Sequence, residues 1–239
     1  MRDSIALAAT ALLFAAATAG AGELTGTAAV ASDYDFRGVS LSAKDPALQG
    51  SIDYAHDSGF YASAWGSNID YGSDVDGDIE IDLIAGWSGE AESGLGWDAG
   101  VVWYLYPDSS SSATESDISD YPEIYAGISY GNFDAKQWYT NDYSGTDLDA
   151  YYTEANYSFE LPADFTLSLH AAYNYGDAFD GFEYFDFSVG LGYTVGHFDL
   201  LLKYTGTDLS GEDEITDDVF NTEPRVVFSI STAFPWGGD

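Results

Sequence analysis

The sequence contains no cysteine, and basic residues are scarce: 6 Lys and Arg stand against 41 Asp and Glu, a formal net charge of −35. The lack of cysteine excludes a disulfide framework and thiolate chemistry, so hydrogen bonding and packing must hold the fold together. The scarcity of Lys and Arg argues against nucleic acid as a partner, because phosphate binding needs clustered positive charge. A chain with this net charge favours cations as the ions or solutes that it binds or passes.

The sequence also lacks a linker. No Pro-rich or low-complexity spacer divides the 239 residues, and their texture is uniform after residue 24, which indicates one domain. The chain has 26 glycines, 6 prolines, a single methionine and 16% aromatic residues. This composition is typical of a β-rich protein with many turns.

The longest apolar run lies at the N-terminus, from Ile5 to Ala19, after Arg2. Small residues follow it at 19–21, so the pattern predicts a secretory signal peptide over residues 1–21 and a mature domain over 22–239. The alternative is a membrane anchor, but this run is shorter than the about 20 residues that a spanning helix needs. The protein is therefore expected to be exported.

Period-two alternation of apolar and polar residues dominates the rest of the chain. It is clearest in 78–88, where Ile79, Ile81 and Leu83 alternate with Glu80 and Asp82. The pattern predicts twelve strands: Leu24–Phe36, Ala47–Asp57, Phe60–Ile69, Asp78–Ser88, Leu95–Tyr106, Tyr121–Tyr130, Phe133–Thr140, Ala150–Phe159, Phe165–Asn174, Tyr184–Thr194, His197–Thr205 and Arg225–Phe234.

The connections between these strands alternate between tight turns and long polar loops. Short turns at one end and long loops at the other are typical of an up-and-down antiparallel β-barrel in an outer membrane. The fold class we predict is therefore all-β: a transmembrane barrel of about 12 strands that follows the signal peptide.

The cost of burying charge in lipid decides which face looks outward. A Lys or Arg at mid-depth costs about 2 to 4 kcal/mol, so the charged face must line the interior. The alternative is a soluble sandwich or lipocalin-like barrel with an apolar core, but the apolar face here mixes Ala and Gly with Leu and aromatics. Aromatics at strand ends are expected to form interface girdles: Tyr34, Phe36, Trp87, Trp103, Tyr106, Tyr130, Tyr175 and Trp236.

The segment from Ser32 to Asp70 carries the motifs F-R-G-V-S, P-A-x-Q-G-x-I-D and G-F-Y-x-x-x-W-x-S-N. With these motifs it resembles the start of the TorF-type porin family, exported β-barrel proteins of proteobacteria. The resemblance implies a Gram-negative outer-membrane location and a pore-type role. Outer-membrane lipid, lipopolysaccharide and the barrel-assembly machinery are then the expected partners, although the chain continues past the aromatic Phe234 to Asp239.

Charged residues on the polar face are the candidate pore-lining set. They are Asp33, Asp35, Arg37, Asp53, Glu80, Asp82, Asp98, Lys136, Asp186, Asp199, Lys203 and Arg225. Two interpretations of the few cations among them stay open. The cations either pair with acids in the wall and offset their repulsion, or Arg37 faces acids across a constriction that orders passing solutes.

Motifs for other chemistry are incomplete. The acidic stretch Asp74–Asp78 lacks the Gly and Glu that an EF-hand needs at its sixth and twelfth positions. His56-Asp57-Ser58-Gly59 resembles the His-x-Ser of outer-membrane phospholipases, but no third group is evident to orient His56. His170 and His197 stand alone, so no metal site, cofactor or enzyme activity is predicted.

We therefore expect a passive, narrow pore that passes cations or small solutes through an acidic lumen. Two alternatives stay open: a closed structural or adhesive barrel whose acidic loops bind divalent cations or a partner, and a lipid-modifying enzyme.

Overall fold

The chain folds as a closed antiparallel β-barrel of twelve strands, as predicted from the sequence. The computed structural model describes residues 22–72, 77–107 and 119–236. The predicted signal peptide, Asp74 and Asp76 lie outside these residues. The barrel strands are β1 (Glu23–Ala31), β4 (Ala47–Ala55), β5 (Phe60–Asn68), β6 (Ile79–Glu90), β7 (Leu95–Leu105), β8 (Tyr121–Tyr130), β9 (Phe133–Thr140), β10 (Ala150–Leu161), β11 (Phe165–Tyr175), β12 (Tyr184–Val195), β13 (Phe198–Thr207) and β14 (Arg225–Phe234).

The remaining regular elements are short and lie in the connections. Strands β2 (Asp35–Phe36) and β3 (Val39–Ser40) pair only with each other. Three 3-10 helices of three residues follow: η1 (Tyr143–Gly145), η2 (Pro162–Asp164) and η3 (Asp177–Phe179). None of the helices in the described ranges is long and apolar enough to cross a membrane.

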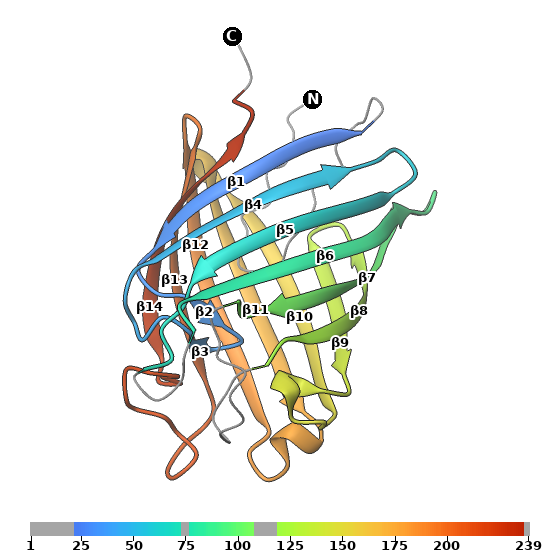
Figure 1. Cartoon of the computed structure of the whole chain (residues 1–239). Coiled ribbons are helices and arrows are strands. Elements are labelled where there is room, and N and C mark those ends of the chain that lie inside the picture. The colour runs from blue at the N-terminus through green and yellow to red at the C-terminus, as the bar shows by residue number, and fades with distance from the viewer. Residues whose placement is uncertain (1–21, 73–76, 108–118, 237–239) are drawn as a thin grey trace.

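The barrel closes where β1 pairs with β14 on one side and with β4 on the other. Closure leaves no free sheet edge, which is the condition for backbone groups to be satisfied in lipid. The start of β1 and the end of β14 lie at the same end of the barrel, next to the short turns, and the described parts of the long connections gather at the opposite end (Figure 1). We call that opposite end the loop end.

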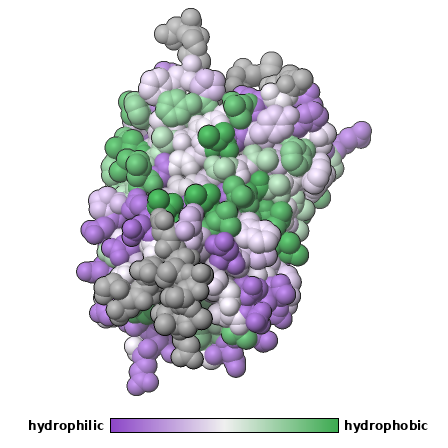
Figure 2. Space-filling view, in the orientation of Figure 1, coloured by the Kyte–Doolittle hydropathy of each residue, from purple (hydrophilic) through white to green (hydrophobic). Residues whose placement is uncertain are grey.

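The strands present an apolar outer face and a polar inner face. Leu48, Ile52 and Leu83 are each about half or more exposed, at 67%, 64% and 48%, whereas Asp53 and Asp82 on the other face are 7% and 8% exposed. Figure 2 shows hydrophobic side chains over the strands and hydrophilic ones gathered toward the loop end. An exposed apolar surface of this extent indicates contact with lipid.

The structure corrects the first predicted strand. Strand β1 ends at Ala31, and residues 32–46 turn into the barrel instead of extending the wall. Tyr34 is consequently 2% exposed, Tyr106 is 7% exposed, and Phe36 on β2 packs against the ring of Tyr104. These three aromatics therefore do not belong to an interface girdle. Four other predicted girdle aromatics do lie on the outer surface. Trp87, Trp103, Tyr130 and Trp236 are 53%, 49%, 64% and 49% exposed.

Candidate functional site

The site centres on residues 32–46, which we call the plug loop. Its tip is the hairpin of β2 and β3, and Figure 1 shows this hairpin within the outline of the barrel near the loop end. Arg37 and Gly38 at the turn both have positive φ angles, 51° and 83°, as the tightest hairpin turns require. A Cβ on Gly38 would lie 2.7 Å from Thr207 Cγ2 and 2.9 Å from Asp186 Cβ, so glycine lets the tip approach the wall.

Two acids of the plug loop, one before the hairpin and one in β2, anchor the loop to β13 and β14. Asp33 accepts hydrogen bonds from Arg225 Nε at 2.5 Å and from Ser40 Oγ at 2.6 Å. Asp35 accepts from Lys203 Nζ at 2.8 Å and from the Arg225 guanidinium at 2.5 Å. Arg225 also donates to the carbonyl oxygen of Gly38 at 2.8 Å. Charge-assisted bonds of this kind are among the stronger ones in proteins.

The tip of the plug loop reaches a different part of the wall. Arg37 binds Glu123 on β8 through two hydrogen bonds of 3.0 and 2.5 Å, and Glu123 also accepts one from Tyr104 at 3.0 Å. The guanidinium carbon lies 4.3 Å from the ring centre of Tyr152 on β10. On another side, Tyr34 donates to Glu80 on β6 at 2.5 Å. The plug loop therefore crosses the bore from β13 and β14 to β6, β8 and β10.

The ionisation of the plug-loop charges supports these pairs. Burial acts to raise the pKa of Asp35, but the charges of Lys203 and Arg225 prevail and hold that pKa below its usual value. Burial acts to lower the pKa of Arg37, and Glu123 more than offsets it, so the pKa lies well above its usual value. Both groups stay charged at neutral pH, and the plug loop stays bound by ion pairs.

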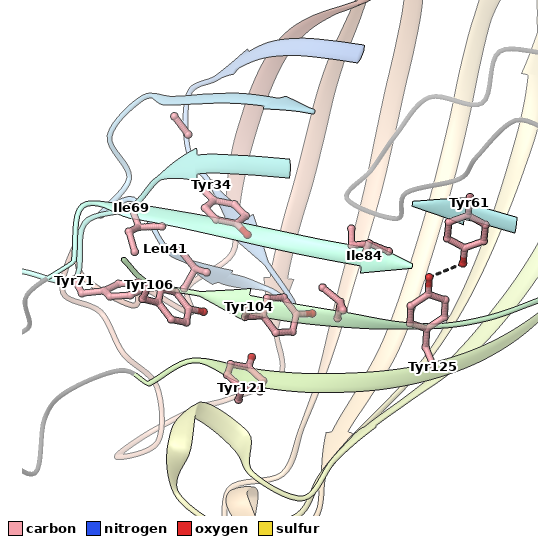
Figure 3. Packing of buried hydrophobic residues seen from close by; sticks show 12 residues of the cluster. Tyr34, Leu41, Tyr61, Ile69, Tyr71, Ile84, Tyr104, Tyr106, Tyr121 and Tyr125 are labelled. Carbon is pink, nitrogen blue, oxygen red and sulfur yellow. Dashed lines mark hydrogen bonds between the residues drawn. The ribbon is translucent and has the colours of Figure 1, made fainter. Parts of the chain in front are cut away.

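Aromatic side chains fill the space around the plug loop at the loop end. Figure 3 shows this cluster, in which Tyr34 and Leu41 of the plug loop lie among tyrosines from the wall and from other connections. Tyr71 stacks on Phe220 with ring centres 4.8 Å apart, and Tyr143 contacts Phe179 at 5.1 Å. Several long connections thus pack over the plug loop and hold it inside.

A second charged group lies on the wall at β7 and β9. Lys136 donates to Asp98 at 3.0 Å, and Asp98 also accepts from Tyr61 at 2.5 Å. Tyr61 and Tyr125 lie side by side with their hydroxyl oxygens 2.5 Å apart, the pair joined by the dashed line in Figure 3. Lys136 therefore faces the interior, where it reaches across β8 to pair with Asp98.

The remaining predicted acids also face the interior. Asp53 accepts from Ser51 and Ser63, and Asp199 accepts from Thr194 at 2.6 Å near the end of the barrel that holds the termini. Asp82 is buried, and its Oδ1 has no hydrogen-bond partner among the described residues. Asp186 accepts from His170, Tyr152 and Asn174. Of the twelve predicted residues, nine lie on the wall, and Asp33, Asp35 and Arg37 lie on the plug loop.

Beside the plug loop lies a cavity of about 80 Å³. Charged groups of both signs and aromatic rings border it, among them Arg37, Tyr152, Glu154, His170, Asp186 and Lys203. Across this cavity, Arg37 at the tip of the plug loop faces Glu154 on β10 and Asp186 on β12.

Sequence reasoning missed three residues of this site: Glu123, Glu154 and His170. Glu123 and Glu154 lie on the polar face of their predicted strands, which was the signal that could have found them. His170 lies on that face too, but the sequence near it shows no partner, because Asn156 and Asp186 are 14 and 16 residues away. Contacts of that separation follow from strand register rather than from a local motif.

The turn between β4 and β5 brings His56 close to Ser58. His56 Nδ1 lies 2.9 Å from Ser58 Oγ, and the same nitrogen accepts the backbone N–H of Ser58 at 3.1 Å. Both residues are exposed, and among the described residues no carboxylate contacts His56. The arrangement is a local turn and lacks the third group that orients the base of a catalytic triad.

The described parts of the acidic loops show no built metal site. In the described part of the chain, no group of three or more His, Asp or Glu side chains is arranged to hold a metal ion. Asp218 is paired with Lys44 at 2.8 Å, and its side chain is 76% exposed.

Comparison with known proteins places the chain in a family and a fold. The bacterial family Gcw_chp, described as a protein of unknown function, matches residues 15–234. The NanC porin has a similar fold, with a TM-score of 0.56 and 11% identity over 90% of this chain and 100% of the NanC chain. The KdgM porin follows at 0.52 and 9% identity, over 90% of this chain and 99% of its own. No curated protein sequence matches.

At such identities the similarity shows the fold, which is that of solved outer-membrane porins. The resemblance to the TorF-type porins stays a prediction, because the description of the matching family names no function.

Proposed function

Because the chain belongs to the Gcw_chp family of bacterial proteins and folds as a porin-like barrel, we propose that it is a narrow pore of a Gram-negative outer membrane. The apolar outer face supports the location, since lipid is the solvent in which such a face is stable. Outer-membrane lipid, lipopolysaccharide and the barrel-assembly machinery are its partners in this proposal. The plug loop narrows the bore, and solutes pass beside it through the polar cavity.

The observation that supports selectivity for cations is the imbalance of charge inside the barrel. Among the described residues, acids outnumber Lys and Arg in the interior by eleven to four. The acids are Asp33, Asp35, Asp53, Glu80, Asp82, Asp98, Glu123, Asp134, Glu154, Asp186 and Asp199, and the bases are Arg37, Lys136, Lys203 and Arg225. Fixed negative charge concentrates cations and excludes anions, so the pore passes cations and small positively charged solutes.

The KdgM porin was solved in complex with oligogalacturonate, an acidic oligosaccharide. In the present barrel an acidic chain would meet an excess of carboxylates. The charge of this interior therefore supports a different class of solute, even though the folds are alike.

Reconstitution in planar lipid bilayers tests the proposal. Under a KCl gradient, the protein should give conductance steps whose reversal potential has the sign of cation preference. The variant D53N/E154Q should reduce that preference, because it removes two interior carboxylates. The matched variant E212Q/D213N changes two acids of the exposed loop before β14 and should leave the preference unchanged. A reversal potential of the opposite sign would contradict the proposal.

A closed structural barrel is the second candidate, and the plug loop is the observation that favours it. Ion pairs and an aromatic cluster hold this loop across the bore. If the folded protein inserts and the bilayer stays silent, the structural role holds. A lipid-modifying enzyme has no comparable support, because His56 and Ser58 lack an orienting group; phospholipid hydrolysis lost on Ser58→Ala would establish it.

A further inference from the structure

His170 occupies an unusual position for a histidine inside this barrel. It lies on β11 with 17% of its side chain exposed, and it borders the cavity beside the plug loop. Its Nε2 is 2.8 Å from Asp186 Oδ1 on β12, and its Nδ1 is 2.7 Å from Asn156 Oδ1 on β10. Both ring nitrogens thus have a close oxygen neighbour.

The neighbours of Asn156 fix the orientation of its amide. Its Nδ2 donates to Asp134 Oδ2 at 2.9 Å and lies 3.3 Å from Glu154 Oε2. Carboxylates accept hydrogen bonds, so the amide nitrogen must point toward them, and Oδ1 must point toward His170. The oxygen that faces Nδ1 is therefore an acceptor.

The neighbours of Asp186 show that it too is an acceptor. Its carboxylate receives hydrogen bonds from Asn174 Nδ2 at 3.0 Å and from the Tyr152 hydroxyl at 3.2 Å, in addition to the contact with His170. A neutral imidazole has one N–H and one lone pair. The Tyr152 hydroxyl also lies 3.1 Å from Nε2, but Asp186 Oδ1 is closer at 2.8 Å and can only accept. A neutral imidazole would therefore turn a lone pair toward either Asn156 Oδ1 or Asp186 Oδ1, whereas an imidazolium donates to both oxygens.

Charged and titratable groups around His170 come from five elements. Tyr152 and Glu154 lie on β10, with Glu154 Oε2 3.8 Å from Nδ1, and Asp134 on β9 reaches it through Asn156. Asp186 lies on β12, Lys203 on β13, and Asp35 and Arg37 on the plug loop border the same cavity. Lys203 and Arg37 have their own acidic partners, Asp35 and Glu123. Glu154, Asp186 and Asp134 form no salt bridge with Lys or Arg among the described residues, although Lys136 on β9 lies opposite Glu154 in the strand register. His170 contacts two of these acids, Asp186 at 2.8 Å and Glu154 at 3.8 Å.

We propose that His170 is held as an imidazolium between Asn156 and Asp186 and that its proton sets the ion selectivity of the constriction. This inference rests on the proposed pore. When His170 is protonated, it offsets one carboxylate beside the cavity. When the proton is lost, the cavity gains one net negative charge and its preference for cations increases.

The size of the effect follows from the distance between the ring and the path of the ion. A unit charge about 6 Å away in water changes the local concentration of a monovalent ion by about threefold. Loss of the proton raises the local concentration of cations and lowers that of anions by about this factor each. The ratio of cation to anion permeability should therefore rise by about tenfold between pH 5 and pH 8, the range in which histidine changes charge.

Reversal potentials measured across this range test the proposal. The variant H170Q removes the titrating group, so it should show the higher cation preference already at low pH and should lose the step. The matched variant H56Q alters an exposed histidine of the turn between β4 and β5 and should keep the step. If H170Q and the wild type show the same pH dependence, His170 does not set selectivity, and the pore itself still stands.

A second measurement does not depend on conduction. The chain has three histidines, so in the double variant H56Q/H197Q the only imidazole is that of His170. Nitrogen-15 NMR of this variant in detergent micelles should show both ring nitrogens protonated at about pH 7, where a free imidazole is mostly neutral. A single neutral tautomer at that pH would overturn the proposal, even if the bilayers were silent.

Discussion

Every Lys and Arg among the described residues is paired with an acid, and most of these pairs are inside the barrel. Arg37, Lys136, Lys203 and Arg225 bind interior carboxylates, and Lys44 binds an exposed one. Paired interior charges are costly to separate, because a charge left alone at low dielectric loses its solvation without compensation. The scarce cations therefore fix the position of the plug loop.

Glu123→Gln tests this at one residue. The variant leaves Arg37 buried without its counter-charge, and removal of one partner of a buried pair costs about 3 to 5 kcal/mol. We expect the plug loop to open more often, seen as faster amide hydrogen exchange in peptides covering 32–46 by mass spectrometry.

The exposed pair of Lys44 and Asp218 provides the matched control. Asp218→Asn breaks an ion pair whose acid is largely in solvent, and such pairs contribute about 0 to 1 kcal/mol. Exchange in 32–46 should then stay close to that of the wild type. Equal exchange in both variants would show that the Arg37–Glu123 pair does not hold the loop.

At the scale of elements, period-two alternation predicts the barrel wall well and the plug loop not at all. The sequence predicts twelve strands, and the barrel has twelve in the same order, with the short β2 and β3 outside its wall. The first predicted strand is five residues too long at its C-terminal end, because Ser32 to Phe36 continues the alternation of β1. What ends the strand is the pairing of Asp33 and Asp35 with Lys203 and Arg225, 168 to 192 residues away. No local pattern encodes a contact at that separation.

Replacing residues 34–41 by a Gly-Ser segment of the same length tests the plug loop as an element. The replacement removes the hairpin and the Arg37–Glu123 bridge, so the bore should widen and single-channel conductance should rise severalfold. The same replacement at 211–218, in the exposed connection before β14, should leave conductance near that of the wild type. Conductance that is unchanged on loss of 34–41 would mean that the plug loop does not narrow the path.

At the scale of the whole molecule, the sidedness of the strands was predictable because its physical cause is simple. Charge is costly in hydrocarbon, so each strand turns its polar residues toward the interior of the barrel. The alternation of polar and apolar residues in the sequence shows directly which residues these are. The candidate site was predictable only in part. Interior acids such as Asp53, Glu80 and Asp98 follow from parity, whereas the joining of His170, Asn156 and Asp186 depends on the register of three strands.

Sidedness also separates a membrane barrel from a soluble one, since a soluble barrel hides its apolar face. The chain has no cysteine, so single cysteines can carry a spin label without interference from native thiols. Leu83 and Ile124 lie on the outer face with 48% and 57% exposure, and Ser63 lies inside with 7%.

Accessibility of these labels in lipid vesicles tests the outward apolar face most directly. Labels at Leu83→Cys and Ile124→Cys should be relaxed strongly by oxygen, which concentrates in hydrocarbon, and weakly by a water-soluble nickel chelate. The label at Ser63→Cys should be little affected by oxygen. If the labels at 83 and 124 instead respond to the nickel chelate as surface labels of a soluble protein do, the barrel does not sit in the bilayer and the proposed pore is contradicted.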